Sequence, residues 1–87
     1  MLEPWQREEV IREALDEFIG KYKYCLIQLD AQEEVIYKKA SNSPREILEA
    51  YEKLNTIHQG KITYFYEVVG KSLKRIAKHR LQKFSSE

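Results

Sequence analysis

The sequence predicts an α+β fold: a two-layer sandwich with the element order α-β-β-α-β-α, in which a three-stranded sheet carries its helices mostly on one face. Three observations predict it. Apolar residues recur at helical spacing in several segments, and other segments are rich in β-branched and aromatic residues. The third is length, because 87 residues leave room for only one domain, over residues 1–87.

The first half of the chain predicts one helix and a hairpin. Residues 2–19 form the helix, whose apolar stripe is Val10, Ile11, Ala14, Leu15, Phe18 and Ile19. Residues 21–30 and 34–40 alternate as strands do. The turn between them is so short that the two strands must pair antiparallel.

The second half predicts a helix, a strand and a last helix. Ser43 and Glu46 form the pattern of a capping box, with proline between them at the first helical position, and so predict a helix start. Residues 61–69, KITYFYEVV, predict the third strand, which Gly70 ends. Residues 71–84 predict the last helix from an apolar stripe of Leu73, Ile76, Ala77, Leu81 and Phe84.

Charge is distributed unevenly along the chain, although the whole carries only +1. Residues 1–20 hold six acidic and two basic residues, whereas residues 71–83 hold six basic residues and no acidic one. Either the first helix packs beside the last and neutralises it, or the basic face is open and binds an anion, most often a phosphate backbone. The candidate nucleic-acid-binding residues are Lys71, Lys74, Arg75, Lys78, His79 and Lys83, with Lys38 and Lys39 from the second strand.

Five of the six tyrosines lie on the predicted strands. On an open sheet face such tyrosines can stack on nucleobases while lysines hold phosphates. They are also good strand residues that tolerate a half-buried position, and an exposed aromatic face can equally be a dimer interface.

Tyr24 on the first strand, Tyr37 on the second and Arg45 in the helix that follows resemble the motifs of the GIY-YIG nuclease superfamily, over roughly residues 22–84. The chain departs from that family in two places. No glycine follows Tyr37, and the last helix has no glutamate to hold a divalent metal. The resemblance therefore implies a catalytically inactive relative that binds nucleic acid.

The sequence gives little support for other catalytic, metal-binding or phosphate-binding motifs. One cysteine, Cys25, predicts a buried apolar side chain in a reducing compartment, and with His58 and His79 as the only histidines no zinc site of standard spacing can be assembled. No glycine-rich phosphate loop exists. We expect no enzyme activity, no metal and no cofactor, no membrane segment or secretory signal, and a cytoplasmic location.

These observations predict a small non-catalytic nucleic-acid-binding or regulatory protein that uses its basic C-terminal helix. The alternative is a protein–protein interaction module or a homodimer, with no role for nucleic acid. The acidic first helix or the tyrosine-bearing strands would then form the interface.

Overall fold

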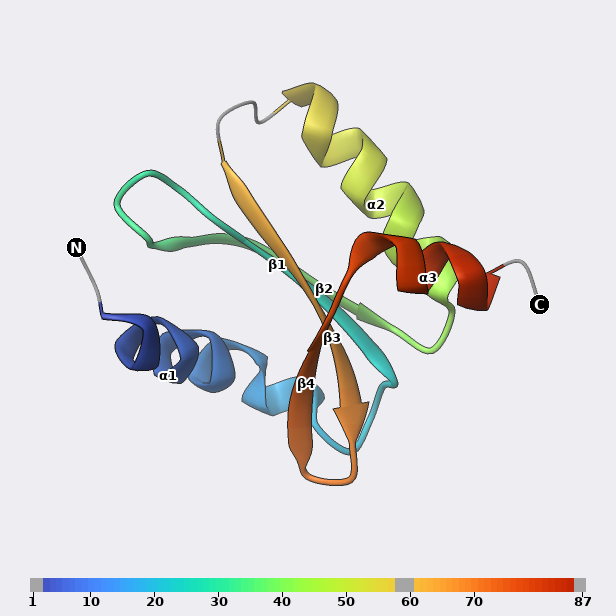
Figure 1. Ribbon diagram of the computed structural model, residues 1–87, viewed down its shortest axis with the longest axis horizontal. Helices are drawn as coiled ribbons and strands as arrows, with labels where there is room; N and C mark the ends of the chain where they lie inside the picture. The colour runs from blue at the N-terminus through green and yellow to red at the C-terminus, as the bar shows by residue number, and fades with distance from the viewer. Residues whose placement is uncertain (1–2, 58–60, 86–87) are drawn as a thin grey trace.

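The computed structural model describes residues 3–57 and 61–85 (Figure 1). Three α-helices, one 3₁₀ helix and four strands follow one another along these residues. In chain order they are α1 (Pro4–Leu15), η1 (Asp16–Phe18), β1 (Tyr24–Leu29), β2 (Val35–Ser41), α2 (Pro44–Ile57), β3 (Ile62–Val69), β4 (Ser72–Ile76) and α3 (Lys78–Ser85).

The strands form one antiparallel sheet in the order β2-β1-β3-β4. β1 is central: Leu26 lies opposite Lys39 of β2 on one side and Phe65 of β3 on the other. β2 and β3 therefore run parallel to each other with β1 between them. The predicted α+β class is confirmed, but the predicted count of three strands is wrong, because β4 adds a fourth at the edge.

Residues 72–76 were expected inside the last helix and form β4 instead. Gly70 has φ of +63° and opens a two-residue turn that brings Ser72 opposite Val69. Glycine adopts this left-handed conformation without steric cost, and such a turn matches the twist of paired strands. The last helix therefore begins at Lys78, and the element order is α-β-β-α-β-β-α.

Helices cover both faces of the sheet, α2 and α3 on one and α1 on the other (Figure 1). Most of the helices therefore share one face, as expected, but the predicted two-layer sandwich is wrong because α1 adds a third layer. On one face, Ile11 and Leu15 of α1 pack with a first core cluster, which contains Cys25, Ile27, Leu29 and Tyr66. On the other face, α2 and α3 pack with a second cluster, which contains Leu26, Ile47, Leu54, Phe65, Ile76 and Leu81. β1 supplies apolar side chains to both, as the central strand of a sheet buried on two sides.

The other expected helices and strands form with shifted ends, but the expected capping box differs, because the Ser43 N–H and the Glu46 carboxylate both bond to the Ser41 hydroxyl. The first helix ends at Leu15 and passes into η1, while its expected start at residue 2 lies outside the described residues. At the start of α2, the Ser43 N–H donates to Ser41 Oγ (3.0 Å), and the Ser41 hydroxyl donates to the Glu46 carboxylate. Within residues 3–57 and 61–85, no helix has the length and apolar character needed to span a bilayer.

Candidate nucleic-acid interface

Two of the eight predicted basic residues lie on the α1 side of the sheet and form ion pairs with acidic residues of α1 and η1. Arg75 of β4 forms an ion pair with Glu8 (2.5 Å). Lys38 of β2 forms one with Glu17 (2.6 Å) and also donates to the carbonyl of Ala14 (2.9 Å). The N-terminal segment therefore neutralises part of the predicted basic surface, and Lys38 has a structural role in holding the end of α1 to the sheet.

Arg75 is the most constrained of these cations. Its guanidinium lies over the Tyr64 ring, 4.0 Å from the centroid, and its Nη2 lies 3.4 Å from the Tyr66 hydroxyl. That hydroxyl also donates to Glu8 (3.1 Å). Burial raises the pKa of Tyr66 to about 12, so the phenol is neutral and acts here as a hydrogen-bonding group.

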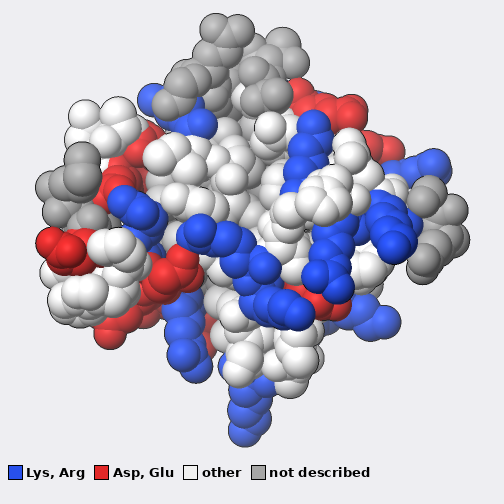
Figure 2. Space-filling view, in the orientation of Figure 1, with Lys and Arg blue, Asp and Glu red and all other residues white. Residues whose placement is uncertain are grey.

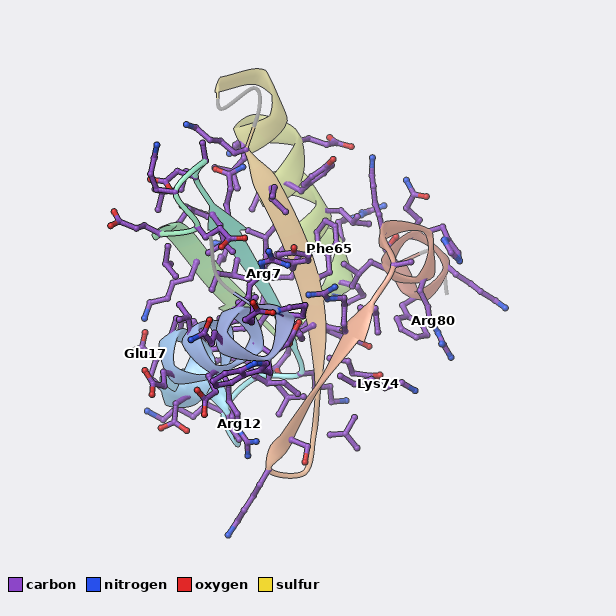
Figure 3. The ribbon with its side chains drawn as sticks, turned by 60° about the vertical axis from the view of Figure 1, so that its left-hand side comes forward. Arg7, Arg12, Glu17, Phe65, Lys74 and Arg80 are labelled. Atoms are coloured by element: carbon purple, nitrogen blue, oxygen red, sulfur yellow. The ribbon has the colours of Figure 1, made fainter. Side chains whose placement is uncertain are left out.

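The other basic residues of this region form a surface on the opposite side, which we call the basic ridge. It runs from the β3–β4 turn along β4 to α3, and it comprises the exposed residues Lys71, Lys74, Lys78, His79, Arg80 and Lys83. Figure 2 shows Lys and Arg side chains gathered over β4 and α3 with little acid between them. Figure 3 shows Lys74 and Arg80 on the side of the molecule away from α1, which carries Arg12, and from η1, which carries Glu17.

The ridge spans two elements, because the run of basic residues passes through strand β4 and continues into helix α3. Ser72, Lys74 and Ile76 alternate onto the α2 side of the sheet, and Leu73 and Arg75 onto the α1 side. Lys74 lies opposite Glu67 of β3, which offsets part of its charge. α1 and α3 lie on opposite faces of the sheet, so the alternative in which the first helix packs beside the last is wrong.

A groove lies where β4 ends. β4 stops at Ile76, opposite Phe65, while β3 extends further, back to Ile62. The chain then turns at Ala77 into α3 and leaves a hollow of about 320 Å³, which we call the edge groove. Its lining includes Lys61, Thr63, Tyr64, Arg75, Lys78 and Tyr51.

The edge groove is cationic and aromatic. Three of its described lining residues are basic and none of them is acidic. Lys78 Nζ lies 4.8 Å from the centroid of the Tyr51 ring, and Arg75 lies over Tyr64, so each side of the groove carries a cation on an aromatic face. Such an arrangement can hold a phosphate and stack on a planar group.

Backbone groups of Thr63 also face the edge groove. The Val68 N–H donates to the Lys23 carbonyl (2.8 Å), which lies on the β1 side of β3. Because backbone direction alternates along a strand, the N–H and C=O of Thr63 and Phe65 point the other way, toward β4. Phe65 meets Ile76 there, whereas β4 has already ended at the level of Thr63.

Lys39 lies apart from these residues. It lines a second hollow of about 390 Å³ between β2 and α2, together with Tyr37, Glu46, Glu49 and Lys53. The charges around that hollow are mixed, so it gives no basis for grouping Lys39 with the ridge.

The sequence reading missed Lys61, Thr63 and Tyr51 because it placed residues 71–84 in one helix. A glycine at the first position of a two-residue turn, followed by the alternating SLKRI, was the available signal. Pairing residues 72–76 with 65–69 would have placed Arg75 and Lys78 beside the start of β3.

The residues behind the nuclease resemblance lie on the α2 side of the sheet. Tyr24 packs on Phe84 of α3, with ring centroids 5.9 Å apart, and Tyr37 packs against the second core cluster. Arg45 is exposed in the first turn of α2. Among the residues that the structure describes, no three His, Cys, Asp or Glu side chains are grouped so that they could hold a metal ion; His58 lies outside these residues.

Cys25 is fully buried, as expected, and burial raises the pKa of its thiol to about 11.

The chain matches no protein-family profile, no curated protein and no solved structure. The resemblance to the GIY-YIG superfamily therefore stays a prediction.

Proposed function

We propose that this protein is a non-catalytic nucleic-acid-binding protein that holds a phosphate backbone on the basic ridge. One observation carries the proposal. Lys74 of β4 and Arg80 of α3 lie on the side of the sheet opposite α1, whereas Glu8 of α1 and Glu17 of η1 form ion pairs with Arg75 and Lys38. Clustered cations of this kind release counterions from nucleic acid when they bind phosphates.

The test is a salt titration of binding to a labelled duplex, measured by fluorescence anisotropy. Each phosphate contact contributes about 0.9 to the slope of log affinity against log salt concentration for duplex DNA. Replacing Lys74 and Arg80 by alanine should therefore lower the slope by about 2 and weaken binding to all sequences alike.

The matched control is the double variant Arg12→Ala/Lys53→Ala, which removes two exposed cations from α1 and α2. It changes the net charge by the same amount and should leave the slope almost unchanged. An equal loss in both double variants would mean that only net charge matters and would contradict the ridge. Binding that does not depend on salt would reject the proposal entirely.

A protein partner is the second candidate, and the two outer strands favour it. β2 and β4 form the two edges of the sheet, and an edge strand can pair with an extended segment of another chain. Both edges also carry consecutive cations, Lys38-Lys39 and Lys74-Arg75. On each edge one of the two cations is already paired, Lys38 with Glu17 and Arg75 with Glu8, so an acidic segment would meet Lys39 or Lys74. Sedimentation at increasing concentration measures self-association directly.

A further inference from the structure

We infer that the edge groove binds a single-stranded nucleotide unit, so that the protein prefers single-stranded nucleic acid to duplex. This inference rests on the proposed function and adds the form of nucleic acid. The ridge can attract any phosphate backbone, whereas the groove combines cations, aromatic rings and an open strand edge. A base that is still paired inside a duplex does not present its faces or its pairing edge to such a surface.

The stacking surface is prepared before any ligand arrives. Arg75 is held by Glu8 and by Tyr66 on one side and rests on the Tyr64 ring. Its side chain is still 46% exposed. A guanidinium plane fixed in this way is a platform on which an unpaired base can stack, and no ordering of the side chain is required on binding.

The groove also offers groups for a phosphate and for a base edge. Lys61 and Lys78 line it together with Thr63, and Lys61 is exposed. The N–H and C=O of Thr63 supply a donor and an acceptor beside each other, which is the pattern that the edge of a base requires. Thr63 is itself anchored, because its hydroxyl accepts a hydrogen bond from Gln28 of β1 (3.1 Å).

The volume of the edge groove fits one nucleotide of a nucleic-acid strand. At about 320 Å³ it lies at the lower end of the range of small-molecule sites, about 300–1,000 Å³. Ridge residue Lys78 belongs to the groove as well, so a strand seated there continues directly onto α3. We therefore expect one base to be held in the groove while neighbouring phosphates lie along the ridge.

The experiment compares a fluorescein-labelled thymidine oligomer of about 10 nucleotides, long enough for one single-strand site, with the duplex that this oligomer forms with its complementary strand. Wild-type protein should bind the single strand more tightly at the same salt concentration. Tyr51→Leu/Lys61→Ala removes the ring that carries Lys78 and one cation of the groove. It should weaken single-strand binding about 5- to 150-fold, the size of one base contact, and should change duplex binding little. The ridge variant Lys74→Ala/Arg80→Ala should weaken binding of both.

Two variants control for folding. Tyr51→Phe keeps the ring, which also packs on Phe65 with centroids 5.2 Å apart, and should bind like the wild type. Lys61→Glu changes only an exposed side chain and should weaken single-strand binding even if the Tyr51 variant is unstable.

Equal affinity for single strand and duplex in the wild type would overturn the inference and leave the proposed function standing. So would groove variants that bind the single strand like the wild type. If neither probe binds, both the inference and the proposed function fail.

Discussion

Replacing Gly70 by alanine tests the hairpin that created both the ridge and the groove. In the structure Gly70 has φ of +63°, and a Cβ added there would meet nothing within 4 Å. The cost is therefore one of backbone conformation, about 1–2 kcal/mol for a residue with a Cβ in the left-handed region. Alanine also restricts the unfolded chain, which returns about 0.4–1 kcal/mol.

The net expectation is a loss of about 1 kcal/mol in the free energy of unfolding, which corresponds to a fall of about 4–8 °C in Tm for a domain of this size. Urea and thermal unfolding followed by circular dichroism measure both quantities. Asparagine tolerates positive φ better than alanine, so Gly70→Asn should lose less stability.

The sign of the stability change on Gly70→Ala distinguishes the hairpin from the helix that the sequence predicted for this segment. If Gly70 instead only joined β3 to a helix over residues 71–84 with a negative φ, Gly70→Ala would raise stability by up to about 1 kcal/mol, because alanine restricts the unfolded chain. A Gly70→Ala protein that is as stable as the wild type, or more stable, would refute the hairpin.

Two further predictions concern the groups around Tyr66. Glu8→Gln removes a half-exposed ion pair with Arg75 and should cost no more than about 1 kcal/mol of stability. It should also weaken single-strand binding about two- to fivefold, because the guanidinium loses part of the hold that orders it for stacking. Anisotropy and thermal unfolding check the two parts, and stronger single-strand binding would contradict the prediction. Burial raises the pKa of Cys25 to about 11 and of Tyr66 to about 12, so the folded state favours both neutral forms. Their stability contribution is complete below the unfolded pKa values of about 9 and 10 and is lost as pH rises toward 12. Urea unfolding across this range should show the decline, and Tyr66→Phe/Cys25→Ala should make it shallower.

Most elements of the fold could be predicted because each had a local signal. The apolar stripe of α1, the proline at the start of α2 and the aromatic runs of β1 and β3 all act over a few residues. The prediction for residues 71–84 was wrong because the apolar pattern of this segment fits both the helical period and the strand period. Leu73 and Ile76 are three apart, as on a helix, but the structure sends them to opposite faces of the sheet.

The position of α1 could not be read from its own sequence. Its stripe predicts that one side is buried, but not against which face of the sheet. The informative segment was β1, where Cys25, Leu26 and Ile27 are apolar in succession. Three consecutive apolar residues in a strand place apolar groups on both faces and so call for cover on both.

The candidate site could be predicted only in part for the same reason. Lys74 lies on the α2 side of the sheet, as α3 with Lys78 does, while Arg75 is separated from them by strand alternation. The edge groove depends on where β4 stops relative to β3. That relation is set by the register of the hairpin, which the reading of residues 71–84 as a helix excluded.

The strand order has a consequence for how the chain reaches this structure. β1–β2 and β3–β4 are each hairpins of neighbouring segments, whereas β1 and β3 join residues such as Leu29 and Ile62 across the whole of α2. Closing that connection has the largest entropic cost and brings both core clusters together in one event. Docking of the two hairpins is therefore the step expected to limit the folding rate, and pairs such as Leu26 with Phe65 are expected to form part of the folding nucleus.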